Sequence, residues 1–308
     1  MIPLEFIEIK EGCFYFKSAV NIGYIVSEDR RAGMLIDAGL EASAAKKAIK
    51  MLQDKKLPIT HLFITHAHAD HFGGAQYIQK NYEVHTIASL LEEAIMRYPI
   101  LEPMYLFHGN TPLKEMRNKF LEAPSIQIDE ICESGIWSDG SFEVEFIHLP
   151  GHSHNQFGIL YNGILYAADA FLGREVIEKH KIPFIVDSAL NFSTLDYLLH
   201  VKVDGMLPGH GAFSDKYEDT IRANIEVHQR LLSQLNNFLI VSGDRGLSME
   251  DLVAKMLVKH EIEPANFGMY SLFRTAITAY LIQLIEEGKA VYTIKEGRPI
   301  IFSGQSSA

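Results

Sequence analysis

Short runs of apolar or alternating residues fill about the first forty positions of the chain. They cover residues 4–9, 13–16, 20–26 and 33–36, and polar turns separate them. Runs of this length with turn residues between them are typical of β-strands. Because the connections are short, the pattern predicts an antiparallel meander.

Helical and strand-like patterns alternate further along the chain. Residues 41–54 repeat apolar side chains at the helical period, and the apolar run 61–65 then indicates a strand. Gly73 and Gly74 allow a second helix to begin close to the end of that strand. Further apolar strands are predicted at 142–149, 158–161, 164–167 and 205–207, with Asn162-Gly163 as the turn of a hairpin.

The densest group of metal-binding side chains lies in the loop after the strand at 61–65. Three imidazoles and one carboxylate fall within six residues, as His66, His68, Asp70 and His71. Such groups are unfavourable in an apolar core, whereas zinc, iron and manganese accept them as ligands. The loop therefore predicts a metal site rather than a helix cap.

Four further candidate ligands, Asp37, His152, Asp169 and His210, each follow another apolar strand. Singly, each has an ordinary structural interpretation. Asp37 could be a turn residue, Asp169 a helix cap, and the two histidines members of tight turns. Their common position at strand ends, together with the dense loop, favours one shared metal site.

The other nine of the 14 histidines carry no such pattern. Residues such as His61, His85, His108 and His148 are interpreted as surface or core histidines. His154 lies two residues beyond a candidate ligand, where it could touch a substrate. We favour a solvated loop position for it.

The composition limits the classes of partner. The chain has 308 residues, 47% of them hydrophobic, and a formal net charge of -11. This charge disfavours a broad basic surface for nucleic acid and is compatible with a small-molecule substrate.

Cellular location is predicted from cysteine usage and hydropathy. Cys13 and Cys132 lie far apart in the sequence, so no disulfide framework and no paired-cysteine metal motif is expected. The N-terminus lacks the pattern of a leader, and no apolar stretch of about 18 residues occurs. We therefore expect a cytoplasmic protein with no membrane partner.

Taken in order, the motifs resemble those of the metallo-β-lactamase superfamily. The resemblance covers about residues 1–230 and implies an α/β (α+β) fold, a four-layer αββα sandwich with the metals at one edge between the sheets. Any one motif is weak, but the set is specific. The motifs lie at 35–39, 65–71, 149–152, 168–169 and 207–211.

The resemblance also implies a role for each candidate ligand. His66, His68 and His152 would hold one divalent metal ion, Asp70, His71 and His210 a second, and Asp169 would bridge both. Asp37 would not bind a metal itself but would orient the ligands through hydrogen bonds. Zinc is the default ion, although iron and manganese accept the same ligands.

Such a pair of ions implies a hydrolytic mechanism. A water held between two divalent ions roughly 3.5 to 4 Å apart loses a proton near neutral pH. Asp70 would then bind a metal and act catalytically by orienting the resulting hydroxide. The expected activity is cleavage of an ester-type bond, a thioester or a lactone, in a small and partly apolar substrate.

Two motif positions narrow the list of related activities. Zinc β-lactamases usually lack a carboxylate at the position of Asp169, which argues against antibiotic hydrolysis. Flavin-linked di-iron relatives usually have Glu at the position of His68. A phosphodiesterase or ribonuclease on the same scaffold remains an alternative, as does a mononuclear iron oxygenase similar to the persulfide dioxygenases.

Residues 89–122 form a dense apolar and aromatic segment between the second and third motifs. As a functional element, it predicts a helical lid that shapes an apolar pocket over the metals. Core packing or the surface of a homodimer would use the same composition. The pattern leaves these interpretations open.

Residues 231–308 read as a separate small domain. Ser248 and Asp251 indicate a helix start, a longer helix is predicted at 267–287, and a hairpin follows across Glu296-Gly297. This order resembles a winged helix, found at the C-terminus of several superfamily hydrolases, including the β-lactamase-like protein 2 group, for which RNA cleavage is known. From residue 230 on, however, eight Lys plus Arg balance eight Asp plus Glu, so nucleic acid binding is not favoured.

Overall fold

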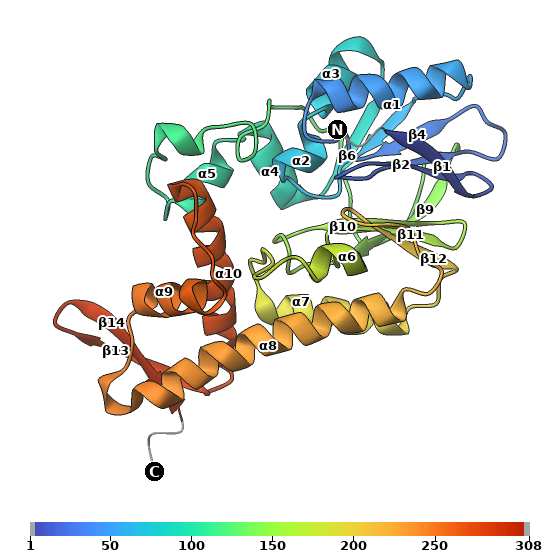
Figure 1. Ribbon diagram of the computed structural model, residues 1–308. Coiled ribbons are helices and arrows are strands. Elements are labelled where there is room, and N and C mark those ends of the chain that lie inside the picture. Colours follow the sequence, from blue (N-terminus) through green and yellow to red (C-terminus); the bar gives the residue numbers. More distant parts are fainter. Residues whose placement is uncertain (1–3, 305–308) are drawn as a thin grey trace.

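The computed structural model describes residues 4–304 and consists of two facing β-sheets with helices on their outer sides (Figure 1). The first sheet contains β1 (Glu5–Lys10), β2 (Cys13–Lys17), β3 (Ile22–Val26), β4 (Gly33–Ile36), β5 (His61–Phe63), β6 (His85–Ala88) and β7 (Glu130–Ile131). Strands β1 to β4 pair antiparallel, which confirms the predicted meander, and β4 to β7 pair parallel. Residues 1–3, at the start of the segment searched for a leader, and residues 305–308 lie outside the described range.

The second sheet has the order β12-β11-β10-β9-β8. Its strands are β8 (Gly135–Ser138), β9 (Glu143–His148), β10 (Phe157–Tyr161), β11 (Ile164–Ala168) and β12 (Gly205–Pro208). The β10–β11 hairpin turns at Asn162 and Gly163, both with positive φ, as the two-residue turn requires. β12 pairs parallel to β11, so the carboxyl ends of these two strands reach the same edge of the sheet.

Successive side chains along a strand point to opposite faces of the first sheet and pack into two separate hydrophobic cores. In β2, Tyr15 belongs to the core between the sheets, whereas Phe14 and Phe16 belong to the core under the outer helices. Phe63 of the first sheet stacks on Phe146 of the second, with ring centroids 4.9 Å apart. Because both faces of the first sheet are buried, its strands are apolar on both sides, as the sequence pattern suggests.

Helices cover both outer faces and complete the predicted αββα arrangement (Figure 1). α1 (Ala42–Asp54) and α3 (Ala75–Asn81) pack on the first sheet, and α7 (Ser188–His200) and α8 (Glu218–Ser242) on the second. Two short helices, α2 (Ala69–Phe72) and α6 (Arg174–Ile177), lie in loops. A Cβ at Gly74 would collide with the backbone carbonyl of Ala38, which explains the glycine before α3.

The segment 89–122 contains α4 (Leu90–Arg97), α5 (Leu101–Leu106) and the 3-10 helix η1 (Lys114–Met116). It packs against the C-terminal region, in which 3-10 helix η2 (Gly243–Arg245), α9 (Met249–Lys259) and α10 (Phe267–Glu286) precede the hairpin β13 (Ala290–Lys295) and β14 (Arg298–Ser303). The predicted helices and hairpin are present, and Ser248 and Asp251 form the predicted capping box. The boundary expected at residue 230 lies inside α8, and the likeness to a winged helix remains a prediction.

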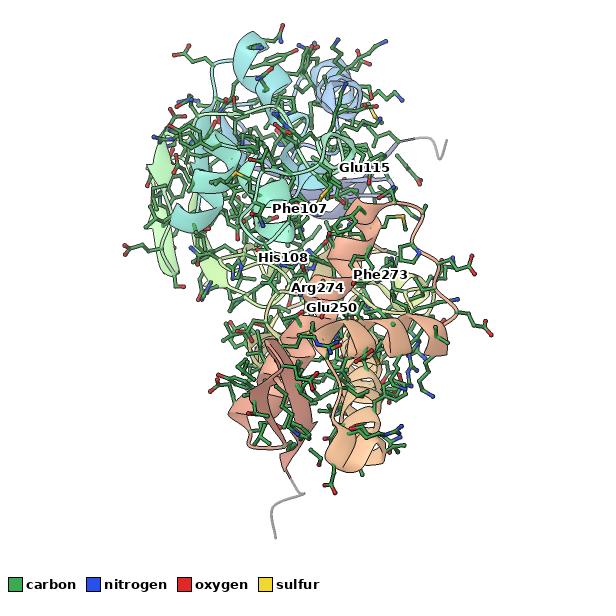
Figure 2. All side chains as sticks on the ribbon, turned by 90° about the vertical axis from the view of Figure 1, so that its left-hand side faces the viewer. Phe107, His108, Glu115, Glu250, Phe273 and Arg274 are labelled. Carbon is green, nitrogen blue, oxygen red and sulfur yellow. The ribbon has the colours of Figure 1, made fainter. Side chains whose placement is uncertain are left out.

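Helix α10 connects the C-terminal region to the 89–122 segment (Figure 2). The rings of Phe107 and Phe267 meet edge to face at 5.5 Å, and the backbone N–H of Phe267 donates to Glu115 Oε1 at 3.2 Å. Arg274 lies between Glu250 and His108, at 3.3 Å from each. The C-terminal region therefore packs directly on the 89–122 segment.

Within residues 4–304, no helix is both long and apolar enough to span a bilayer.

Candidate metal centre

Loops from both sheets bring the seven predicted ligands together at one edge of the sandwich. The loop after β5 carries two of them, α2 two more, and the loops after β9, β11 and β12 one each. All seven therefore lie at strand ends or directly beyond them, as predicted. They are His66, His68, Asp70, His71, His152, Asp169 and His210.

The first group of ligands consists of three imidazoles. Nδ1 of His68 lies 3.0 Å from Nε2 of His66 and 2.9 Å from Nε2 of His152. Two ligand atoms bound at about 2.0 Å to one tetrahedral ion lie about 3.3 Å apart. The three ring nitrogens are therefore spaced as ligands of a single ion.

The second group consists of Asp70, His71 and His210, whose ligand atoms also lie within 4.8 Å of one another. Nε2 of His210 is 3.3 Å from Oδ2 of Asp70. This group combines imidazole with carboxylate, a donor set that suits zinc, iron or manganese.

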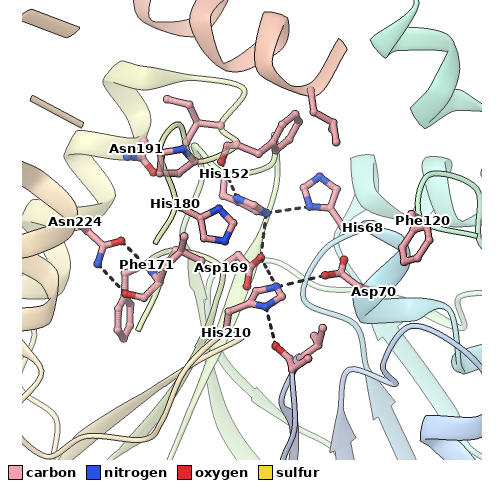
Figure 3. A pocket seen from close by; sticks show the side chains of 18 of the residues that line it. His68, Asp70, Phe120, His152, Asp169, Phe171, His180, Asn191, His210 and Asn224 are labelled. Atoms are coloured by element: carbon pink, nitrogen blue, oxygen red, sulfur yellow. Dashed lines mark hydrogen bonds and ion pairs between the residues drawn. The ribbon is translucent and has the colours of Figure 1, made fainter. Parts of the chain in front are cut away.

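Asp169 lies between the two groups (Figure 3). Its Oδ2 is 3.3 Å from Nε2 of His152 in the first group. The same oxygen is 3.5 Å from Nε2 of His71 and 3.4 Å from Nε2 of His210 in the second. This position supports the bridging role that the sequence resemblance implies.

The outward-facing ring nitrogens are held by the protein. Nδ1 of His152 donates to the carbonyl of Phe184 at 3.1 Å, and Nδ1 of His210 to the carbonyl of Ala19 at 2.9 Å. A carbonyl oxygen only accepts, so each Nδ1 carries the hydrogen and Nε2 offers its lone pair to the centre. This orientation of the rings is typical of metal-binding histidines.

Asp37 lies outside the set of metal ligands, as predicted, and contacts both His71 and the ligand loop. Its Oδ2 is 2.7 Å from Nδ1 of His71, and its Oδ1 accepts from the backbone N–H of Thr65 at 2.9 Å. Asp37 and Ala168, which precedes Asp169, both have positive φ, at 66° and 48°. Such conformations cost about 1–3 kcal/mol each and are typical of functional sites.

Unpaired polar atoms within the cluster suit bound cations. Among the described residues, His71 Nε2 and Asp169 Oδ1 are buried without a hydrogen bond. A buried polar atom without a hydrogen bond is unfavourable. Bound cations would give both of these atoms a partner. A Cβ at Gly209 would collide with the Asp169 carboxylate and the His71 ring, so a glycine there leaves space for them. The residues therefore fit the metal ions that the fold implies.

Burial lowers the pKa of the first three histidines. The pKa of His66 falls well below its ordinary value, and those of His68 and His152 fall to about 4. All three rings are therefore neutral at physiological pH, which is the form that binds metal.

The second group has the opposite electrostatic character. Burial would lower the pKa of His71 and His210, but Asp169 raises both, that of His210 to about 10. Burial would raise the pKa of Asp169, but His210 and His71 hold it well below its usual range. Negative charge at this end of the cluster thus attracts protons, and metal ions would compete for the same atoms.

Three positioning residues have no recognisable sequence signal. Glu92 of α4, which is 1% exposed, accepts from the backbone N–H groups of Ala67 and Asn155 at 2.8 and 2.9 Å. Gln156 Oε1 accepts from the backbone N–H of Asp169 at 3.2 Å. Asn21 Nδ2 donates to the backbone carbonyls at 208 and 211, on either side of His210. Each looks like an ordinary polar residue in the sequence, because its partners are distant in the chain.

A cavity of about 470 Å³ opens beside the ligands. His68, Asp70, His152, Asp169 and His210 line one end of it (Figure 3). The segment 89–122, the loop 170–185 and α10 supply further walls, so the predicted lid contributes to a pocket.

Histidines outside the ligand set differ in their position relative to this cavity. His180 and His228 line it, although nothing in the sequence singles them out. His154 is exposed and lies outside it, as expected of a solvated loop residue.

Comparisons with known proteins identify a family that matches most of the chain. The family model described as "Metallo-beta-lactamase superfamily" matches residues 16–225. A Beta-lactamase-like protein 2 homolog from Drosophila melanogaster is 23% identical over 241 residues, which cover 78% of this chain and 73% of that protein. A Hydroxyacylglutathione hydrolase from Pelagibacter ubique is 25% identical over 133 residues, 43% of each chain.

Two solved structures share the fold over nearly the whole chain. A beta-lactamase domain protein from Burkholderia ambifaria superposes with a TM-score of 0.73 at 17% identity, covering 97% of this chain and 95% of that one. A metallo-beta-lactamase family protein from Thermus thermophilus gives 0.69 at 16% identity, with 96% and 100% covered. Since the family model spans more than half of the sequence, the chain belongs to the metallo-beta-lactamase superfamily and is a metal-dependent hydrolase.

Proposed function

We propose that this protein hydrolyses an ester-type bond, a thioester or a lactone, in a small and partly apolar substrate at a centre of two divalent metal ions. The observation that carries the proposal is the cavity beside the ligands, whose lining residues include neither Lys nor Arg within 4–304. Phosphate recognition generally uses such cations. An uncharged ester-type substrate therefore suits the cavity better than a phosphodiester.

The ligand arrangement supports two ions rather than one. The ligand atoms of Asp70, His71 and His210 lie within 4.8 Å of one another, as do those of the first group, and Asp169 lies within 3.5 Å of both groups. A single-iron oxygenase would need only one of these groups. Asp70, His71 and His210 would then converge without a metal ion to bind.

The chain's own residues would act around the reacting bond. When bound, the two divalent ions supply Lewis acidity and lower the pKa of a water molecule. Asp70 lines the cavity, where its carboxylate can accept a hydrogen bond from the attacking water and orient it. The water oxygen forms a bond to the acyl carbon while the carbon–sulfur or carbon–oxygen bond breaks, and the released thiol or alcohol takes up a proton. The apolar walls exclude other water from this step.

The names of two relatives are relevant here. The Pelagibacter relative is named for hydrolysis of a hydroxyacylglutathione, which is a thioester. At 25% identity over 43% of the chain it supports the bond type only. The Drosophila relative is named after the fold and indicates no substrate.

A substrate panel tests the proposal. The purified protein, with its metal content measured, is assayed with thioesters, lactones, phosphodiesters and single-stranded RNA. We expect close to two metal ions per chain and turnover of a thioester or a lactone. One iron with thiol-dependent oxygen uptake would establish the oxygenase instead, and metal-dependent cleavage of RNA alone would establish the ribonuclease. Asp70→Asn serves as the matched inactive control in every assay.

A further inference from the structure

The cavity beside the metal ligands is walled mainly by apolar side chains. They come from segments distant in the chain: the 89–122 segment, the loop after β11, and α10, which contributes Leu272. The walls thus combine the catalytic domain with the C-terminal region. The aromatic and aliphatic members include Phe120, Leu121, Phe171, Leu172, Phe184 and Ile185.

Two polar side chains of the wall, Asn224 and His228, are engaged within the protein, whereas Asn191 Nδ2 is buried there without a hydrogen bond to any described residue. Asn224 accepts from the backbone N–H of Leu172 at 2.9 Å and donates to its carbonyl at 2.8 Å. Nδ1 of His228 lies 2.7 Å from the hydroxyl of Tyr280, and burial lowers the pKa of His228 to about 4, so its ring is neutral. These groups maintain the wall and add no charge to it.

The acidic side chain of Glu102, on α5, also lines the cavity. It is 4% exposed and, among the described residues, makes no hydrogen bond or ion pair. Burial and the neighbouring Asp70 raise its pKa well above the ordinary value. In either protonation state, Glu102 adds no positive charge to the cavity.

From these walls we infer the substrate class: the cavity binds an uncharged, apolar acyl group of the substrate and rejects an acyl group that ends in a negative charge. This inference rests on the proposed hydrolysis, because the acyl carbon must lie at the metal end of the cavity. A volume of about 470 Å³ is within the range of small-molecule sites and leaves room for an acyl chain beyond that carbon.

The physical reason is the free energy of transferring the acyl chain from water into the cavity. Each methylene that moves from water into an apolar wall contributes enough to raise kcat/KM roughly fourfold. A carboxylate at the far end of the acyl chain, away from the metal ligands, loses its hydration and meets no Lys or Arg among the described lining residues, which lowers kcat/KM by about a hundredfold or more. The difference in kcat/KM between an apolar acyl group and one that ends in a carboxylate is therefore large enough to measure directly.

The first experiment uses the metal-loaded wild-type protein and thioesters of one thiol, N-acetylcysteamine. We expect kcat/KM to rise by roughly fourfold per methylene from acetyl to hexanoyl. The adipoyl thioester, which has the length of hexanoyl and a terminal carboxylate, should react about a hundredfold more slowly than hexanoyl. Equal rates across the series, or an adipoyl rate equal to the hexanoyl rate, would overturn the inference.

A charge-swap variant tests the wall itself. Leu272→Lys places an ammonium group in the cavity, and we expect it to reverse the preference from hexanoyl toward adipoyl thioester. Leu272→Gln separates charge from polarity and should lose hexanoyl turnover without gaining adipoyl turnover. Ile282→Lys is the matched control, because Ile282 lies on the same helix but is 52% exposed and outside the cavity. A Leu272→Lys variant that is folded by circular dichroism and keeps the wild-type preference would contradict the inference.

Binding measured without turnover separates this inference from the proposed function. Octanamide, which is uncharged and has no ester-type bond, should raise the melting temperature of the metal-loaded wild type but not of Leu272→Lys. If octanamide binds and no thioester or lactone is hydrolysed, the proposed function fails and the cavity assignment stands. If thioesters are hydrolysed without chain-length preference and octanamide does not bind, the cavity assignment fails alone.

Discussion

The carboxylate of Glu92 joins the second and third ligand loops through Ser153, whose hydroxyl donates to Glu92 Oε1 at 2.7 Å across 61 residues of sequence. The other oxygen of the same carboxylate accepts from the backbone N–H of Ala67 at 2.8 Å. Ala67 lies between His66 and His68, and Ser153 directly follows His152. One buried side chain of the 89–122 segment therefore sets the distance between the imidazoles of the first ligand group.

We expect Glu92→Gln to weaken metal binding at the first ligand group by about ten- to hundredfold. The amide has only one acceptor oxygen, so its NH₂ group must face either the Ala67 N–H or the Asn155 N–H, and that backbone group loses its acceptor. Titration of the metal-free protein with zinc should show one weakened site and one site of wild-type affinity.

Glu93→Gln is the matched control for that experiment. Glu93 is the next residue of α4 and is also buried, but it pairs with Arg97 rather than with a ligand loop. It should titrate like the wild type. Two unaffected sites in Glu92→Gln would show that its carboxylate does not position the imidazoles.

Removal of a ligand side chain should abolish turnover and leave the fold in place. His68→Ala deletes a nitrogen that lies within 3.0 Å of both other imidazoles, and we expect kcat to fall by about a thousandfold or more. The exposed His154→Ala is the control and should keep wild-type kcat. Circular dichroism of both variants checks the fold, and substantial turnover by His68→Ala would disprove its role as a ligand.

Metal removal should destabilise the protein reversibly. Without cations, His71 Nε2 and Asp169 Oδ1 stay buried without a hydrogen bond to the described residues. A ligand at a thousandfold excess over its Kd stabilises the folded state by about 4 kcal/mol. We therefore expect the melting temperature to drop on treatment with a chelator and to return when zinc is added. An identical melting temperature with and without metal would contradict the assignment of these atoms.

The buried His228 should make stability depend on pH below neutrality. Burial lowers its pKa from 6.5 to about 4 in the folded protein. Between these values the unfolded chain binds the proton and the folded chain does not, so the free energy of unfolding falls as the pH falls from 6.5 towards about 4. The loss from this residue reaches about 3 kcal/mol at the lower end.

The difference between wild type and His228→Gln isolates that contribution, because the metal ligands titrate in both proteins. We expect the two stability curves, measured by denaturant unfolding, to approach one another as the pH falls through this window. Above pH 6.5 their separation should stay constant. A constant separation at all pH values would mean that His228 keeps its ordinary pKa.

Local patterns in the sequence predict much of the fold and the candidate ligands. The strands around Tyr15 and Asn162, the helix at 42–54 and the capping box at Ser248 depend on neighbouring residues, and the structure confirms them. Strands β6 to β8 are short or lack apolar alternation, so their existence depends on the sheets that they join.

The sequence by itself determined which side chains stand at the strand ends, because ligand spacing and apolar runs are local properties of the chain. Only the tertiary structure decided that Glu92 connects two ligand loops, that Asp169 lies between two ligand groups, and that Leu272 of α10 forms part of the cavity wall. These relationships join residues far apart in the chain. They arise from packing of whole sheets and helices, and no local pattern of residues records them.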